Sequence, residues 1–272
     1  MLTRFIALAY GVVCYLVFFA TTLYLIGFLG DLGVPRSIDS GPPTSPALAL
    51  LIDAALIGMF AAQHSLMARP WFKRVWIRIV PEPVERATYV LCSSLALFLV
   101  CWQWRPMGGQ VWSFESPTIR WAFHGLYFSG WLLLIASTCM IDHLDLFGLR
   151  QVWERFRGRA PMPLEFRETG LYRHIRHPIY LSWLCIFWAT PQMSVGHFVF
   201  ATITTAYIFA AVRFEERDLI EFHGEVYRRY RERVPMLIPV GRGVDRSRVM
   251  AAGRKPNAPQ GAGLHGVPRP DR

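Results

Sequence analysis

Four apolar stretches of this 272-residue sequence constrain its fold more than any other feature. They run roughly over residues 5–29, 47–67, 87–104 and 119–141. A helix of about 20 apolar residues crosses the hydrocarbon core of a bilayer, so each stretch predicts a membrane span. The first stretch follows Arg4, lacks a small-residue cleavage site and is too long for the core of a signal peptide. We therefore expect it to be retained as a span.

The composition agrees with a lipid environment. Hydrophobic residues make up 53% of the chain, charged residues 18%, and the mean hydropathy is +0.28. The net charge of +10 does not indicate nucleic acid, because Lys and Arg lie in short segments between the apolar runs and in the tail, as the positive-inside rule predicts. The five cysteines lie within apolar runs and form no Cys-x-x-Cys pair, which argues against a disulfide framework or a zinc site.

A further apolar region has a different pattern. Residues 179–212 contain no Asp, Glu, Lys or Arg, but Pro191 and Gly196 bracket a polar break. The break divides the region into two helices of unequal length, and we expect a hairpin that enters and returns on one side of the membrane. The predicted fold class is an all-α integral membrane protein with four transmembrane helices and a C-terminal helical hairpin.

The connections between the spans predict their orientation. The first connection carries only Arg36 against Asp31 and Asp39, whereas the second is crowded with cations. Those cations are Arg69, Lys73, Arg74, Arg78 and Arg86. Because cytoplasmic loops are enriched in Lys and Arg, we expect the second connection, the N-terminus, residues 142–177 and the C-terminal segment to be cytoplasmic.

The domain organisation follows from the same pattern. Residues 1–240 are expected to form one membrane domain, with the spans in 1–141 and the polar functional segments in 142–240. Residues 241–272 are rich in Gly, Pro, Ala and Arg and have no apolar period, so we expect them to be disordered. The oligomeric state is not indicated by any of these features.

The first polar segment lies just before the hairpin and includes Tyr172, Arg176, His177, Pro178 and Tyr180. Proline suits the first position of a helix and holds the residue before it in an extended conformation. Arg176 and His177 therefore lie at a helix mouth, where free N–H groups and the helix dipole favour an anion such as a carboxylate or phosphate.

The second polar segment follows the hairpin and opens with Glu215 and Glu216. Beyond them, apolar residues recur at helical spacing and predict one amphipathic helix on the bilayer surface. These residues are Leu219, Phe222, Val226 and Tyr230. The basic residues around both segments are explained equally well as membrane-flanking anchors, but Arg176 and Glu216 converge across the hairpin without a structural need.

These two segments resemble the membrane methyltransferases related to isoprenylcysteine carboxyl methyltransferase. The shared motifs are Arg176-His177-Pro178-x-Tyr180, Glu215-Glu216-x-x-Leu219, Gly224-x-x-Tyr227-x-x-Tyr230 and Arg233-Val234-Pro235-x-x-Ile238-Pro239. A closer resemblance, over residues 1–240, is to the methanethiol S-methyltransferases. It is carried by Ser37-Ile38-Asp39-Ser40-Gly41, Gln63-His64-Ser65-Leu66-Met67-Ala68-Arg69-Pro70, Phe147-Gly148-Leu149-Arg150-Gln151-Val152 and Thr204-Thr205-Ala206-Tyr207.

The resemblance implies S-adenosylmethionine as cofactor and a small thiol as acceptor, with dimethyl sulfide as the product from methanethiol. It also implies a cytoplasmic-side pocket formed by the matching positions. The implied cofactor residues are Tyr172, Arg176, His177, Pro178, Tyr180, Glu215, Glu216, Tyr227 and Tyr230, with Arg233 closing the pocket. Within this set we expect Arg176 to bind the methionine carboxylate and Glu216 the amino group or ribose.

Thiol methylation also requires the thiol to lose its proton, and a simple thiol has a pKa no lower than about 8.5. We expect His64 to be the base, or Arg176 or Arg233 to stabilise the thiolate. A histidine at a span terminus is also a common interface residue. No two histidines share a short ligand spacing on one clear helix face, so neither a metal nor haem is indicated.

Three other functions remain compatible with the sequence. The residues do not exclude a prenylated cysteine as methyl acceptor, because Arg233 is a suitable partner for its carboxylate. A sterol-type membrane reductase would place NADPH against the same polar segments. A non-enzymatic membrane protein linked to nitrogen-oxide metabolism resembles parts of the N-terminal half. Retention of S-adenosylhomocysteine, NADPH or neither distinguishes the methyltransferase, the reductase and the accessory protein.

Overall fold

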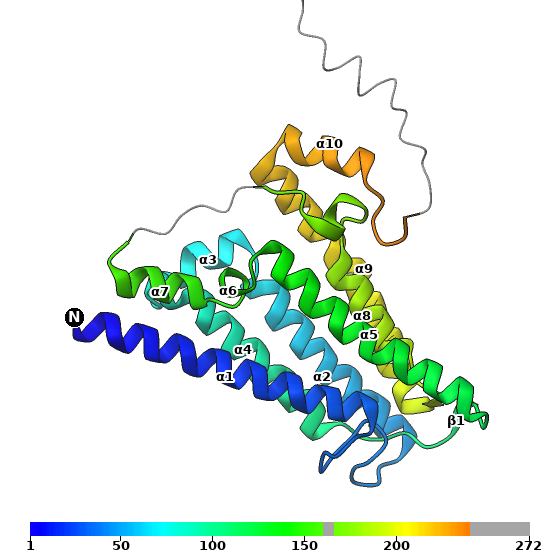
Figure 1. Ribbon diagram of the computed structural model, residues 1–272. Coiled ribbons are helices and arrows are strands. Elements are labelled where there is room, and N and C mark those ends of the chain that lie inside the picture. Colours follow the sequence, from blue (N-terminus) through cyan, green and yellow to red (C-terminus); the bar gives the residue numbers. More distant parts are fainter. Residues whose placement is uncertain (160–165, 240–272) are drawn as a thin grey trace, which may run out of the picture. The chain divides into compact units, whose positions relative to one another are not determined.

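The computed structural model describes residues 1–159 and 166–239, and this part of the chain is mainly helical (Figure 1). In it, five helices are long and apolar enough to cross a membrane. They are α1 (Leu2–Gly30), α2 (Pro46–Met67), α4 (Glu82–Gln103), α5 (Pro117–Ile141) and α9 (Val195–His223). The four predicted spans correspond to the first four of these helices. The tail predicted to be disordered lies outside the described residues.

Shorter elements connect or follow these helices. They are α3 (Pro70–Trp76), β1 (Gln110–Ser113), α6 (His143–Leu146), α7 (Leu149–Arg157), the 3₁₀ helix η1 (Gly170–Arg173), α8 (Pro178–Trp188), β2 (Gln192–Ser194) and α10 (Glu225–Arg233). Proline begins α2, α3, α5 and α8, where its missing N–H has no intrahelical acceptor and its fixed φ suits the first turn.

The long helices expose apolar side chains outward. Leu16, Leu51 and Leu132 are 57%, 67% and 68% exposed, although each lies well inside a helix. Soluble proteins rarely leave so many large apolar residues uncovered, whereas lipid covers them without cost. The buried core lies between the helices and includes Phe28, Trp104 and Phe200, whose rings meet edge to face. The protein is therefore an integral, multi-pass membrane protein.

The hairpin of the sequence prediction is present, but its two arms differ more than expected. The 11 residues of α8 extend about 16 Å, which is too short to cross a hydrocarbon core of about 30 Å. The 29 residues of α9 are long enough. α9 thus adds a fifth candidate span to the four predicted, because its helix continues through the charged residues Glu215 and Glu216 instead of stopping at Val212.

The prediction of one continuous surface helix after the hairpin is wrong. Gly224 has φ +60° and ψ −132°, a conformation that side-chain-bearing residues avoid, and it divides the segment between α9 and α10. The predicted apolar stripe is divided with it. Phe222 and Val226 are exposed by 76% and 59%, whereas Tyr230 is buried. The turn at Gly224 brings α10 back over the end of α9.

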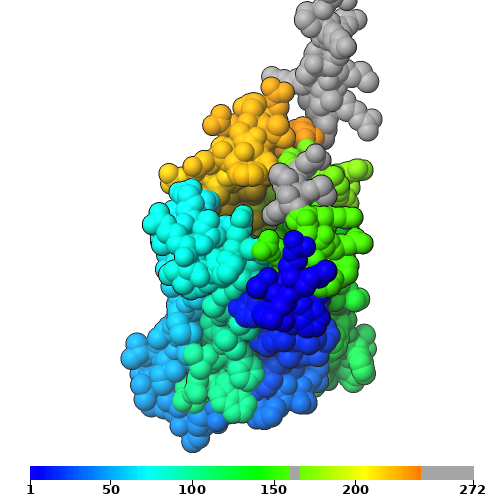
Figure 2. Space-filling view, turned by 90° about the vertical axis from the view of Figure 1, so that its left-hand side faces the viewer, coloured from blue at the N-terminus to red at the C-terminus, as the bar shows by residue number. Residues whose placement is uncertain are grey.

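The two ends of the helix bundle have different characters. β1 and β2 pair antiparallel at one end, where they join the α4–α5 connection to the α8–α9 connection. The opposite end holds the start of α1, helices α3, α6 and α7, and the junction of α9 with α10 (Figure 1). Figure 2 shows the α3 region, in cyan, beside the yellow and orange residues of α9 and α10. An ion pair of 2.7 Å between Arg69 and Asp218 joins these regions.

Candidate active site

The two polar segments meet through one carboxylate. The Nε atom of Arg176, before α8, lies 2.8 Å from Oε1 of Glu216 on α9, and Nε2 of His177 lies 3.0 Å from the same oxygen. The Arg176 and Glu216 side chains are each 11% exposed, and that of His177 is 5% exposed. The convergence of Arg176 with Glu216 predicted from the sequence is therefore observed.

The segment after α10 is fixed to the same point by the backbone. The N–H groups of Arg176 and His177 donate to the carbonyl oxygens of Pro235 and Met236, at 2.9 and 3.1 Å. The Arg176 guanidinium also donates to the carbonyl oxygens of Arg231 and Val234. A guanidinium has five N–H donors and no acceptor, so Arg176 can satisfy several carbonyl oxygens at the C-terminal end of α10. Arg176 thus connects α8, α9 and the segment beyond α10.

Glu215 has different partners from Glu216, which is paired with Arg176. It accepts a 2.6 Å hydrogen bond from the Tyr180 hydroxyl, and among the described residues no cation pairs with it. Tyr172 also lies within electrostatic range of the Glu215 carboxylate, as do Tyr89 and Tyr207. Among the described residues, the site therefore contains a partly buried carboxylate that accepts a hydrogen bond from Tyr180, lies within electrostatic range of three further tyrosines and has no direct ion-pair partner.

Tyr227 and Tyr230 lie on the buried face of α10. Their rings pack with Phe166, and the Tyr230 hydroxyl donates a 2.6 Å hydrogen bond to the Tyr172 carbonyl oxygen. Burial raises the pKa of all three tyrosines, Tyr172, Tyr227 and Tyr230, and nearby carboxylates raise it further. These phenols consequently stay protonated and act as hydrogen-bond donors at neutral pH. The contact between Tyr230 and Tyr172 holds α10 over the η1 turn.

Arg233 is not brought to the Glu215 and Glu216 carboxylates. It forms a 2.7 Å ion pair with Glu168, and its side chain is 50% exposed. The structure thus places Arg233 at the outer edge of α10, where it joins this helix to the segment before η1. A direct role in stabilising a thiolate receives no support from this position.

His64 lies on α2 within a polar cluster between α2 and α4. Its ring nitrogens are 3.1 Å from the Tyr89 hydroxyl, and Nδ1 is 3.2 Å from the Ser93 hydroxyl. The next residue, Ser65, shares a 3.0 Å hydrogen bond with Tyr207 on α9. Since Tyr89 and Tyr207 both lie within electrostatic range of Tyr180 and Glu215, the cluster adjoins the tyrosine-lined carboxylate.

Tyr89, Ser93 and Tyr207 were not predicted to be site residues, although Tyr207 belongs to one of the motifs shared with the methanethiol S-methyltransferases. Hydroxyl-bearing residues are common in membrane helices and carry no charge, so the residue type alone does not mark them. A signal was nevertheless present, because Gln63, His64 and Ser65 form a polar run at the end of an apolar span. Polar side chains at that depth face the protein interior and find partners there.

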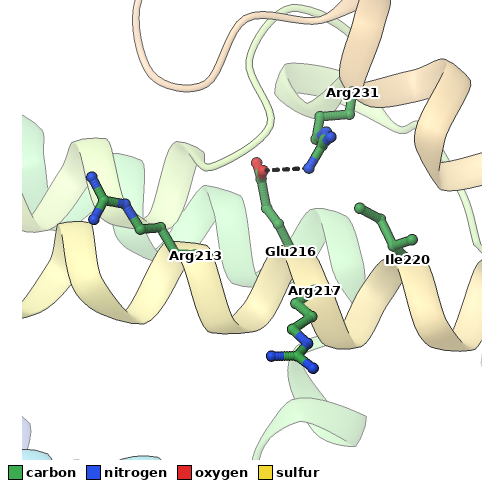
Figure 3. Close-up of a pocket in the computed structure, with 5 residues that line it drawn as sticks. All are labelled: Arg213, Glu216, Arg217, Ile220 and Arg231. Carbon is green, nitrogen blue, oxygen red and sulfur yellow. Dashed lines mark ion pairs between the residues drawn. The ribbon is translucent and has the colours of Figure 1, made fainter.

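A shallow depression of about 320 Å³ lies beside Glu216, which forms part of its lining. It is lined by Arg213, Glu216, Arg217 and Ile220 of α9 and by Arg231 of α10 (Figure 3). Glu216 and Arg231 point toward each other, at 3.8 Å. Among the described residues, no group of three or more His, Cys, Asp or Glu side chains is arranged to hold a metal ion.

Comparisons with known proteins identify close relatives. The chain is 49% identical over 238 residues to a methanethiol S-methyltransferase of Crocosphaera subtropica, covering 88% of this chain and 93% of that protein. It is 46% identical over 236 residues to the methanethiol S-methyltransferase of Mycobacterium tuberculosis, covering 87% and 97%. It is also 29% identical over 236 residues to nurim of Bos taurus, covering 82% and 89%.

No family model and no solved structure matches the chain. The similarity to the methanethiol S-methyltransferases covers nearly the whole length of those enzymes, and it includes both the spans and the polar segments. The chain belongs to the methanethiol S-methyltransferase family.

Proposed function

We propose that the protein transfers a methyl group from S-adenosylmethionine to methanethiol, producing dimethyl sulfide. Its family membership makes it a methyltransferase. The observation that supports this cofactor is Glu215, a carboxylate without a cationic partner in the described chain, which lies among tyrosines next to the His64 cluster. When bound, the cofactor supplies a methyl group on a positively charged sulfur.

The residues around Glu215 fit a cationic ligand. A carboxylate in a poorly hydrated site attracts a positive group strongly, and the faces of aromatic rings attract it further. Tyr172 and Tyr180 supply such rings, while Tyr227 and Tyr230 support them from α10. We assign the positive charges of the cofactor, its sulfonium and amino groups, to Glu215 and these tyrosines.

Glu216 receives a different role from the one expected from the sequence. Its carboxylate is already neutralised by Arg176 and lies 3.0 Å from the His177 ring, so it has little capacity left for the amino group or ribose of the cofactor. Arg176 is similarly occupied by Glu216 and by backbone carbonyls. We propose that these two residues and His177 hold the walls of the cofactor site together. Pro178 fixes the start of α8 beside them.

On the acceptor side we propose His64 as the group that takes the thiol proton. The Tyr89 and Ser93 hydroxyls orient the imidazole ring, and the apolar walls of α2 and α4 suit a small, uncharged thiol. The cofactor would supply its methyl group to the thiol sulfur and leave as the neutral thioether, and the thiol proton would pass to the imidazole nitrogen. Holding the two sulfur atoms and the methyl carbon in line contributes up to about 7–11 kcal/mol in favourable models.

We further propose that the end of the bundle with α3, α7 and α10 faces the cytoplasm. The positive-inside rule supports this placement, because Lys73, Arg74, Arg155 and Arg157 lie at that end. Both chain termini are then cytoplasmic. Because α8 is too short to cross alone, the chain reaches the opposite side through α8 together with residues 189–194, and it returns through α9.

The cofactor assignment is tested by comparing affinities for S-adenosylmethionine and S-adenosylhomocysteine, which differ by the methyl group and one positive charge. Glu215→Gln keeps the size of the side chain and removes its charge. We expect the variant to lose about tenfold or more in affinity for the sulfonium cofactor but much less for the neutral thioether. Glu221→Gln, an exposed change on the same helix, is the matched control.

Calorimetry in detergent would supply these affinities. Equal losses for both ligands in Glu215→Gln would contradict the proposed contact with the sulfonium. Binding of NADPH, with neither adenosyl compound retained, would contradict the methyltransferase assignment and favour a reductase.

A further inference from the structure

A group of three arginines lies beside the proposed cofactor site without belonging to it. Arg213 and Arg217 are one turn apart on α9, and Arg231 lines the same depression from α10. In Figure 3 the Arg231 side chain points toward Glu216, while those of Arg213 and Arg217 extend in other directions. In the described part of the chain, neither Arg213 nor Arg217 has an ion-pair or hydrogen-bond partner. Glu216, the acidic residue of the depression, is already neutralised by Arg176. We refer to Arg213, Arg217 and Arg231 as the arginine cluster.

The charge of the cluster selects its ligand. S-adenosylmethionine carries a carboxylate, an ammonium group and a sulfonium group, so it is a net cation that three arginines would repel. A phosphate group has the opposite charge and matches the planar, fork-shaped donors of guanidinium groups. The depression, of about 320 Å³, lies at the lower end of the usual range for ligand sites of about 300–1,000 Å³.

The position of the cluster indicates where the phosphate comes from. Arg213 is the first charged residue after the uncharged run 179–212, so it lies where α9 leaves the hydrocarbon core. Phe209, one turn earlier on the same face of α9, is 41% exposed, and Phe214 is 57% exposed. Phosphate groups of phospholipids lie at this depth of a bilayer, and their acyl chains lie beside such apolar side chains.

We infer that the arginine cluster is a binding site for the phosphate group of an anionic phospholipid. The lipid bridges α9, through Arg213 and Arg217, to α10, through Arg231. The Arg231 carbonyl oxygen also accepts a hydrogen bond from Arg176, at 2.9 Å. A lipid at the cluster consequently joins α10 to α9 in addition to this hydrogen bond, which holds α10 with or without the lipid.

The test compares lipid binding by the whole protein and two variants, using native mass spectrometry after exchange into phosphatidylglycerol or phosphatidylcholine. Arg213→Gln/Arg217→Gln removes two charges from the cluster. Arg228→Gln/Arg229→Gln is the matched control, because these arginines lie on α10, outside the depression, and pair with Glu225. An arginine near a membrane surface is worth about fivefold in binding anionic lipid, so the cluster variant should lose at least about fivefold for phosphatidylglycerol.

The control should change by less than about twofold, and neither variant should alter the affinity for S-adenosylhomocysteine. If both variants lost the same affinity for phosphatidylglycerol, the binding would depend only on the general surface charge, and the proposed site would be wrong. Lost S-adenosylhomocysteine affinity in the cluster variant would assign the arginines to the cofactor instead. Displacement of the lipid by inorganic phosphate alone would make the cluster a site for a free anion. The lipid result does not depend on whether methanethiol is the acceptor.

Discussion

The Arg176 guanidinium and the Glu216 carboxylate lie 40 positions apart in the sequence and 2.8 Å apart in space. Their ion pair joins the start of α8 to the charged end of α9, and the remaining Arg176 donors hold the chain beyond α10. His177 shares the same carboxylate oxygen. All three side chains are largely buried. The ion pair therefore stabilises the contact between the start of α8, the end of α9 and the segment that follows α10.

Glu216→Gln should therefore destabilise the protein, because it leaves the buried Arg176 charge uncompensated. Breaking a buried ion pair costs about 3–5 kcal/mol, whereas losing an exposed one costs about 0–1 kcal/mol. Glu225→Gln, which removes the exposed pairs with Arg228 and Arg229, is the control. Thermal unfolding in detergent would measure both. A Glu216→Gln protein as stable as the control, yet unable to bind cofactor, would restore the direct cofactor contact expected from the sequence.

His64→Asn should lower kcat/KM by about 10²–10⁴-fold if the imidazole takes the thiol proton. The defect should shrink as the pH rises above the thiol pKa of about 8.5 or higher, because the thiolate then forms without a base. The pH profile of dimethyl sulfide production measures this effect. His124→Asn, near the start of α5 and away from the His64 cluster, is the control. A defect in His64→Asn that stays constant across the pH range would mean that the residue only shapes the pocket.

Gly224→Ala should weaken cofactor binding and stability together. The backbone of Gly224 has φ +60° and ψ −132°, and an L side chain in that region costs about 1–3 kcal/mol. Relief of the strain would move α10, and with it Tyr227 and Tyr230. Gly58→Ala is a suitable comparison, because the added methyl group meets nothing within 4 Å and alanine favours a helix. Identical behaviour of the two variants would show that α10 does not depend on the turn.

The proposed orientation predicts the accessibility of single cysteines in a background without the native ones. Gln110→Cys on β1 and Arg157→Cys at the end of α7 lie at opposite ends of the bundle, and both positions are exposed. A membrane-impermeant maleimide added to intact cells should label residue 110 and leave residue 157 unlabelled until the cells are opened. Labelling of both positions from the same side would contradict the topology.

The sequence predicted α1, α2, α4 and α5 well because each is a continuous apolar run, and lipid requires every backbone group in such a run to be paired within a helix. It did not predict α9 as a span, because the charged residues after Val212 interrupt the apolar pattern but not the helix. It also predicted the meeting of Arg176 with Glu216, since a short hairpin leaves its two ends few alternatives. The broken helix at Gly224 was missed because the apolar spacing continues across the glycine without interruption. The turn accompanies the hydrogen bond from Tyr230 to Tyr172, a tertiary contact that the apolar spacing does not reveal.

The roles of the two glutamates were not readable from the sequence either. Glu215 and Glu216 are adjacent and identical in chemistry, so only the direction of each side chain separates them. On a helix, neighbouring residues point about 100° apart. This rotation directs Glu216 to Arg176 and His177 and leaves Glu215 beside Tyr180. The proposed ligand contacts therefore move from Glu216 to Glu215 once the side chains are seen.

Methyl transfer to methanethiol can be followed with a cofactor that is labelled in its methyl group. Membranes containing the protein would receive S-adenosylmethionine labelled in the methyl group, together with methanethiol or a farnesylcysteine analogue. Headspace chromatography would follow labelled dimethyl sulfide, and solvent extraction would follow labelled methyl ester. We predict labelled dimethyl sulfide with methanethiol, and no labelled ester. Labelled ester from the farnesylcysteine analogue, without labelled dimethyl sulfide, would show that methanethiol is not the methyl acceptor.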